Sequence, residues 1–204
     1  MKRIFILFII ALLSNTISWA QYTDIQQAMK KYKKVNTMTA SVVRTKHNVA
    51  LYNDVVTNGK LFFKQPSHVS MIFNGGKDKL LMNGSNFVMV NNSRQSVAKG
   101  KTQSQFDAFL MVFRNVLLGE NCDIKGIADT KVTRKGNMCT LTVTPVVDGG
   151  KKTQKRLMFT SFSLVIDLKS AEFKSLRMNE RGGNYTQYDF SGYTFGGNVD
   201  DKCF

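Results

Sequence analysis

The segment HVSMIFNGGKDKLLMNGSNFVMV, residues 68–90, decides the fold. Three short runs in it are typical of β-strands: 68–73, 79–83 and 87–90. Two turn signals separate these runs: Asn74-Gly75-Gly76 and Asn83-Gly84. Asn-Gly pairs between apolar runs are a strong signal for tight hairpins. The segment therefore predicts an antiparallel meander.

The same pattern continues along the chain in both directions. Upstream, strand-type runs rich in Val, Thr and Phe cover 40–49 and 55–64. Downstream, further β-type runs cover 122–134, 137–147, 154–167, 173–179 and 185–190. Strands do not alternate with helices as they do in a parallel βαβ sheet. We therefore expect a mainly β domain with a few helices, built on one large curved sheet or barrel.

Two segments have helical periodicity instead. The first is expected to begin after the N-cap Thr23, with Ile25, Met29 and Tyr32 on its apolar face. The second is expected to begin at Ser104 and to end near Gly119.

The second helix is unusually apolar. One stripe carries Phe106, Phe109, Leu110 and Phe113, and much of the remaining surface is apolar as well. Such a helix must be buried on more than one side or must cover an apolar surface. These four residues are the candidate lid.

The N-terminus has the three-part pattern of a cleavable secretory signal. Lys2 and Arg3 precede an unbroken apolar run, and Ser18-Trp19-Ala20 supplies small residues at a cleavage site. The alternative is an uncleaved anchor, but a spanning helix needs about 20 apolar residues. We expect residues 1–20 to be removed and 21–204 to form a single exported domain. Residue 21 is Gln rather than Cys, so the expected mature chain is not lipid-anchored.

Catalytic and metal-binding signatures are missing from the sequence. There is no GxSxG, HExxH or P-loop motif. His47 and His68 are far apart, and exposed strand or turn positions are their simpler interpretation. The formal net charge of +15 suits anionic surfaces or partners, but no basic block with interleaved aromatic residues indicates nucleic-acid binding. We expect a protein without catalysis, cofactor or metal.

The chain has three cysteines, Cys122, Cys139 and Cys203. An exported protein can oxidise two of them. Cys139 shares a predicted strand face with Leu141, so we expect a buried free thiol there. The sequence leaves open whether Cys122 and Cys203 pair.

Large, flexible apolar side chains are abundant on the predicted strands. Taken alone, these residues favour the simpler interpretation, an ordinary core filled with Met and Phe. A curved sheet under an apolar helix would also enclose a concave cavity that can hold an acyl chain. The candidate lining residues of that cavity are Val42, Leu61, Phe63, Met71, Phe73, Leu81, Phe87, Met89, Leu141 and Met158.

Four segments resemble, in order, parts of a known family. GKLFFKQP (59–66) is similar to the family's G-x-L-x-(aromatic)-K-x-P strand, and MTASVVR (38–44) looks like its first strand. LLMNGSNFVMV (80–90) and MNERGGNYTQYDF (178–190) resemble two of its hairpins. The family is that of the periplasmic outer-membrane lipoprotein carriers (LolA). The resemblance spans essentially all of the expected mature chain.

The resemblance implies an incomplete, unclosed antiparallel β-barrel with a helical lid over an apolar cavity. It implies a monomeric periplasmic carrier that binds the acyl chains of lipoproteins and shuttles them from the inner to the outer membrane. The implied partners are an inner-membrane lipoprotein-releasing ABC transporter and an outer-membrane receptor. In the family, an Arg before the strand-ending Pro couples lid opening to lipoprotein binding. Gln65 holds that position here beside Lys64, so these two residues are the lid-coupling candidates.

Two other functions are weighed against a carrier. A periplasmic sensor or regulatory domain on the same fold would bind a lipid or a protein partner without shuttling cargo. An enzyme on this fold is the least favoured, because no catalytic constellation is visible.

Overall fold

The computed structural model describes residues 23–84, 86–118, 127–146 and 158–204. Residues 23–29 form a helix that continues into the 3₁₀ turn η1 (Lys30–Lys34). The remaining elements, in chain order, are β1 (Thr37–His47), β2 (Val55–Lys64), β3 (His68–Phe73), η2 (Asn74–Gly76), β4 (Asp78–Asn83), β5 (Asn86–Asn91), β6 (Arg94–Val97), α2 (Gly100–Leu118), β7 (Ala128–Lys135), β8 (Met138–Pro145), β9 (Phe159–Asp167), β10 (Glu172–Glu180), η3 (Arg181–Gly183), β11 (Tyr185–Phe195) and η4 (Asp201–Cys203).

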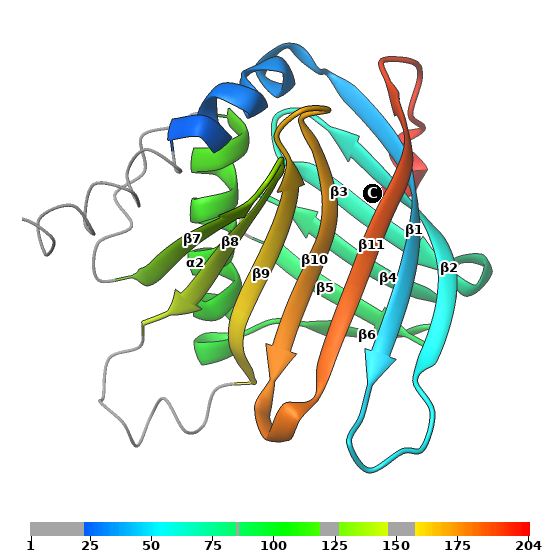
Figure 1. Ribbon diagram of the computed structural model, residues 1–204. Coiled ribbons are helices and arrows are strands. Elements are labelled where there is room, and N and C mark those ends of the chain that lie inside the picture. The colour runs from blue at the N-terminus through cyan, green and yellow to red at the C-terminus, as the bar shows by residue number, and fades with distance from the viewer. Residues whose placement is uncertain (1–22, 85, 119–126, 147–157) are drawn as a thin grey trace, which may run out of the picture.

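The strands form one 11-stranded sheet with the order β6-β5-β4-β3-β2-β1-β11-β10-β9-β8-β7. Every neighbouring pair is antiparallel. The edge strands β6 and β7 do not pair with each other, so the curved sheet is an unclosed barrel (Figure 1). This confirms the expected fold class.

Strand β1 joins the two halves of the sheet, because it pairs with β2 on one side and β11 on the other. Its residues alternate in burial: Met38, Ala40, Val42 and Arg44 are buried, whereas Ser41 is exposed. Successive residues of a strand point to opposite faces of a sheet. The buried set therefore lines the concave interior, and the other set faces outward.

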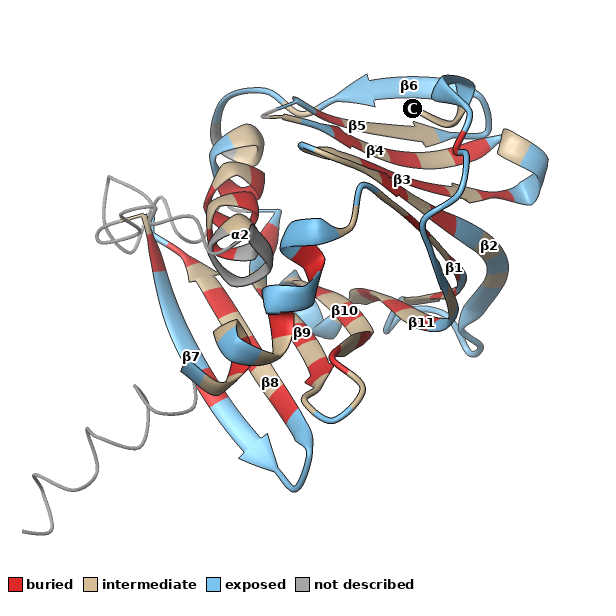
Figure 2. Cartoon of the chain, turned by 90° about the horizontal axis from the view of Figure 1, so that it is seen from above, coloured by how far each residue is buried: buried red, intermediate tan, exposed pale blue. Residues whose placement is uncertain are grey.

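Helix α2 lies across the open side of the sheet (Figure 2). The ring of Phe106 stacks on Phe87 of β5, with centroids 3.4 Å apart, and meets Phe159 of β9 edge-on at 5.1 Å. The buried side-chain amide of Gln105 donates a 2.6 Å hydrogen bond to the carbonyl of Phe159. Through these contacts α2 connects the two halves of the sheet where their edge strands remain unpaired.

The two helices were predicted, but the start of α2 was not. The helix begins at Gly100, one turn before the expected cap Ser104. The Ser104 hydroxyl donates to the carbonyl of Gly100 at 3.2 Å, which is the bond of a serine inside a helix and not of an N-cap. The expected end at Gly119 lies outside the described residues.

Most of the predicted strands are present, with shifted ends. β6 was not predicted, because all four of its residues are exposed and its sequence lacks alternation. The run expected from residue 122 is described as a strand only from Ala128. Cys139 is a buried free thiol, as expected, and burial raises its pKa. Cys203 is also a free thiol, and Cys122 lies outside the described residues.

Candidate functional site

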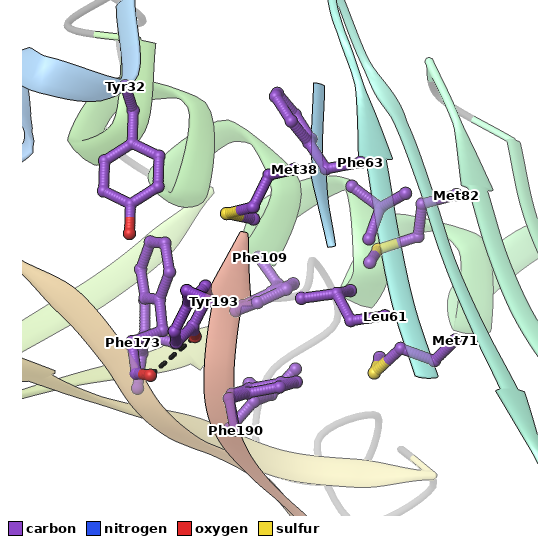
Figure 3. Close-up of a pocket in the computed structure, with 13 residues that line it drawn as sticks. Tyr32, Met38, Leu61, Phe63, Met71, Met82, Phe109, Phe173, Phe190 and Tyr193 are labelled. Atoms are coloured by element: carbon purple, nitrogen blue, oxygen red, sulfur yellow. Dashed lines mark hydrogen bonds between the residues drawn. The ribbon is translucent and has the colours of Figure 1, made fainter. Parts of the chain in front are cut away.

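One end of the sheet's interior contains an apolar cavity beneath the helices. The side chains that line it are all apolar or aromatic: Tyr32, Met38, Leu61, Phe63, Val69, Met71, Met82, Phe109, Leu164, Phe173, Leu176, Phe190 and Tyr193. Figure 3 shows side chains from both halves of the sheet facing this common space. They include Leu61 and Met71 on one side and Phe173 and Phe190 on the other.

Strand register brings the lining residues together. Met38 of β1 is the pairing partner of Phe63 on β2, and Leu61 of β2 is the partner of Met71 on β3. Paired residues of neighbouring strands point to the same face of the sheet. One wall of the cavity is therefore made of consecutive inward positions on β1, β2 and β3.

Two aromatic side chains on the helical segments complete the enclosure. Tyr32 of η1 packs on Phe173 of β10, with ring centroids 5.6 Å apart. Phe109 of α2 stacks on Phe162 of β9 at 4.9 Å. The lid over the cavity thus has two parts, one from η1 and one from α2.

Polar groups at the cavity are limited to two phenol hydroxyls. The Tyr193 hydroxyl donates a 2.6 Å hydrogen bond to the carbonyl of Phe173. The Tyr32 hydroxyl is buried and has no hydrogen-bond partner among the residues that the structure describes. Burial raises the pKa of both phenols well above the ordinary value, so both remain neutral at physiological pH.

The cavity is narrow in this conformation. About 40 Å³ of it is free for the centre of a water-sized sphere, within about 550 Å³ of empty space that includes its open mouth. One buried water needs about 10–15 Å³ on this measure. The closed form therefore has room for a few water molecules, and lining side chains must move apart before an acyl chain can enter.

Nine of the ten predicted cavity residues are divided among the apolar cavity, the core around it and a second cavity. Leu61, Phe63 and Met71 line the apolar cavity. The buried core around it, but not its lining, contains Val42, Phe73, Phe87 and Leu141. Met89 and Met158 lie at a second cavity, at the opposite end of the interior.

Leu81 was placed wrongly. The inward positions of β4 are Asp78, Leu80 and Met82, and Leu81 lies between two of them on the outer face. The period of two in a strand excludes adjacent residues from sharing one face. Met82, which shares the inward face with Leu80, is the residue of β4 that lines the cavity.

Sequence reasoning missed most of the cavity wall. The missed residues are Tyr32, Met38, Val69, Met82, Leu164, Phe173, Leu176, Phe190 and Tyr193. Register shifts interrupt the alternation, so Phe173 and Leu176 on β10, and Phe190 and Tyr193 on β11, are three residues apart. The long-range pairing of β1 with β11 then brings these residues opposite β2 and β3.

The predicted lid residues on α2 are buried where they are described. Phe106, Phe109 and Leu110 all have at most 8% of their surface exposed. Phe109 alone of these three lines the cavity, whereas Phe106 connects β5 to β9. The side chain of Phe113 lies outside the described part of the structure.

Gln65 links the end of β2 to the lid. Its side-chain amide donates to the carbonyl of Tyr32 at 3.3 Å and to that of Lys33 at 3.2 Å. Its backbone N–H donates to the carbonyl of Asn36 at 2.8 Å. Lys64 instead forms an ion pair with Asp201 near the C-terminus. Of the two lid-coupling candidates, Gln65 is the one that contacts the helical segment.

No group of three or more His, Cys, Asp or Glu side chains within the described ranges could hold a metal ion. His47 is half-buried and lies 2.7 Å from a carboxylate oxygen of Asp54. His68 packs edge-on against Phe204. The two histidines are on different strands and do not form a common site.

The fold and cavity define a class of protein: an unclosed antiparallel half-barrel whose helices cover an apolar interior. A family model described as "Outer membrane lipoprotein carrier protein LolA" matches residues 33–204. The chain therefore belongs to the LolA family, and that description names a carrier and not an enzyme.

Several solved structures are similar in fold. A DUF1329 family protein from Desulfovibrio piger has 13% identity and a TM-score of 0.46, with 90% of this chain and 95% of that chain covered. A LolA superfamily protein from Nitrosomonas europaea has 9% identity and a TM-score of 0.39, with 88% and 96% covered. The MucA/MucB complex of Pseudomonas aeruginosa has 10% identity and a TM-score of 0.45, with 89% and 59% covered. The family assignment rests on the family model.

A search of the curated proteins found no match to this chain. None of the helices within the described ranges is both long enough and apolar enough to cross a membrane.

Proposed function

We propose that this protein is a periplasmic carrier that binds the acyl chains of lipoproteins in the apolar cavity and shuttles them from the inner to the outer membrane. The observation that carries the proposal is a cavity lined only by apolar and aromatic side chains under a two-part lid. Membership of the LolA family supports the same cargo.

The chemistry of the cavity suits a hydrocarbon chain. Burial of each methylene contributes about 0.8 kcal/mol. About ten buried methylenes would contribute about 8 kcal/mol, which corresponds to micromolar affinity before the cost of opening the cavity is subtracted. The cavity must widen to accept them, so part of this free energy is used to separate the lid from the sheet.

Gln65 is proposed to couple the lid to the sheet. Its amide hydrogen bonds to η1 hold Tyr32 over the cavity, and Leu61 and Phe63 on the same strand line the wall. Displacement of that wall by a bound chain would strain the same strand end that holds the lid closed. The Lys64–Asp201 ion pair lies at the surface and is assigned no part in this coupling.

The expected partners follow from the carrier role. They are an inner-membrane lipoprotein-releasing ABC transporter, which supplies the cargo, and an outer-membrane receptor, which accepts it. The signal-like residues 1–20 support export to the periplasm, and a mature chain beginning at Gln21 would not be lipid-anchored.

A cavity-filling substitution tests the acyl-chain site. Leu61→Trp should weaken binding of a fluorescent fatty-acid probe by at least about tenfold, because the indole fills the narrow space. Leu51→Trp makes the same change at a position that is 55% exposed and should leave the probe affinity unchanged. Thermal unfolding monitors the fold, and Leu164→Phe on the opposite wall is a milder second variant. Equal affinity in the wild type, in Leu61→Trp and in Leu164→Phe would refute the proposed site.

Affinity capture from the native host's periplasm tests the cargo. A carrier should retain lipoproteins through their acyl chains, and Leu61→Trp should lose them. Retention of a signalling protein by both the wild type and Leu61→Trp would instead support a regulatory domain.

A further inference from the structure

A second cavity lies in the interior of the sheet, at the end opposite the apolar cavity. It is lined by Arg44, Lys46, Lys79, Leu80, Met89, Asn91, Met158, Phe159, Met178, Glu180, Thr186 and Tyr188. It shares no lining residue with the first cavity. About 190 Å³ is free for the centre of a water-sized sphere, compared with about 40 Å³ in the first. The second cavity therefore has more free space than the first in the same conformation.

One lining residue of this cavity, Arg44, belongs to a buried ion pair. The guanidinium of Arg44 donates to a carboxylate oxygen of Asp78 at 2.7 Å, and both side chains are more than nine-tenths buried. Asp78 also accepts from the side-chain amide of Asn74 at 2.8 Å and from the backbone N–H of Asn92 at 2.9 Å. The Arg44 hydrogen bond is the main reason that the pKa of Asp78 lies below its usual value. The carboxylate is thus ionised and fully engaged.

Arg44 has hydrogen-bonding capacity left over. Its Nε is buried and has no acceptor within the described ranges of the chain. One face of its guanidinium lies 4.4 Å from the ring centroid of Phe73, and a terminal nitrogen makes a long 3.4 Å contact with the Thr57 hydroxyl. A buried N–H donor without a partner costs about 1–3 kcal/mol. Arg44 therefore lines a charged cavity and carries a buried N–H whose hydrogen-bonding capacity is unused within the described residues.

Lys46 adds a second cation two residues further along the same inward face of β1. Within the described part of the chain its ammonium has one hydrogen bond, a 3.5 Å contact with the side-chain oxygen of Asn91, and no carboxylate partner. Burial is the main cause that lowers the pKa of Lys46, and the neighbouring charge of Arg44 acts in the same direction. Asp78 and Glu180 raise it. An additional negative charge in the cavity would stabilise both cations.

The wall beside these charges is apolar. Leu80 and Met89 are pairing partners on β4 and β5, and Met178 and Tyr188 contribute from β10 and β11. The cavity therefore combines three cationic side chains, Arg44, Lys46 and Lys79, with a surface for hydrocarbon. Asp78 is paired with Arg44, and Glu180 lies at the same cavity, so three cations face two carboxylates. The excess of one positive charge suits a single anionic group.

We propose that this second cavity binds an amphiphile with one anionic head group, a carboxylate or a phosphate, and an alkyl chain. The head group lies between Arg44 and Lys46, and the first part of the chain lies against Leu80, Met89 and Met178. This site is independent of the proposed acyl-chain carrier function of the first cavity. The carboxylate would come from a free fatty acid and the phosphate from a phospholipid.

The test measures equilibrium binding of three probes below their micellar concentrations: dodecanoate, dodecyl phosphate and neutral methyl dodecanoate. Lys46→Gln should weaken at least one anionic probe by about tenfold and leave methyl dodecanoate unchanged. Lys60→Gln removes the same charge from an exposed position on the neighbouring strand β2 and should have no effect. Glu180→Gln should tighten the same anionic probe by about threefold, because it removes the opposing charge.

The outcomes separate the sources and decide the proposal. A charge-sensitive affinity for dodecanoate points to fatty acids, and one for dodecyl phosphate points to phospholipids. If Lys46→Gln behaves like Lys60→Gln with both anionic probes, the site does not recognise an anionic head group. Because Glu180→Gln is expected to act in the opposite direction, a general loss of folding cannot imitate the full pattern.

Discussion

The two ends of the same interior differ in chemistry although the same strands build both. On β1, Met38 lies at the apolar cavity and Arg44 at the charged one. On β11, Phe190 lies at the first and Thr186 at the second. The period of two decides that all four side chains point inward. Their distance along the strand decides which cavity they line, so one folded sheet carries two different binding environments.

The largest loss of folding stability is expected when the carboxylate paired with Arg44 is removed. Asp78→Ala would leave the guanidinium of Arg44 buried without its counter-charge, and such changes cost about 3–5 kcal/mol. Asp54→Ala removes a carboxylate from a partly exposed pair with His47 and should cost less than about 1 kcal/mol. Urea unfolding of both variants measures the contrast. Similar losses for the two variants would show that the buried pair has no special weight.

Gly59 of β2 lies directly against its pairing partner Phe73 of β3, which is in the buried core between the two sheet halves' interior walls. A Cβ added at Gly59 would overlap the carbonyl oxygen of Ile72 and would lie 2.7 Å from Cε1 of Phe73. Gly59→Ala should therefore cost about 1–3 kcal/mol through forced displacement of the ring. Asn58→Ala, at the exposed neighbouring position, should be nearly neutral in the same unfolding measurement. A neutral Gly59→Ala would mean that β2 and β3 adjust freely at this point.

The smallest effects are expected at the apolar end, where two tyrosines should respond in opposite directions. Tyr193→Phe loses the hydrogen bond to the Phe173 carbonyl and should destabilise the fold by about 1 kcal/mol. Tyr32→Phe removes a buried hydroxyl that has no partner and should stabilise the fold by a similar amount. Thermal unfolding of the pair gives the sign of each change. Destabilisation by Tyr32→Phe would indicate that its hydroxyl is satisfied in solution.

The sequence predicted the fold well because its signals are local. The Asn-Gly turns and alternating runs of residues 68–90 gave β3, β4 and β5 to within one residue at each end. The start of α2 was missed because Ser104 fits a capping pattern even when the helix begins earlier, at Gly100. β6 was missed because an exposed edge strand needs no apolar residues.

The cavity was harder to predict because it depends on pairing between distant strands. Leu61, Phe63 and Met71 were recognisable as inward residues of neighbouring strands. Phe173, Phe190 and Tyr193 join them only through the pairing of β1 with β11 and of β11 with β10. Tyr32 was predicted on a buried helix face, but its place over the cavity follows from the packing of η1 against β10.

The central claim is that acyl chains bind at the apolar end, and photo-crosslinking tests it most directly. A diacylated lipopeptide with a diazirine in one acyl chain is bound to the full protein, irradiated, and the labelled residues are identified by mass spectrometry. If acyl chains bind there, the label is expected on Met38, Leu61, Met71 or Met82, and Leu61→Trp should lose this labelling. Labels confined to Met89 and Met178, or to the outer face of the sheet, would contradict it.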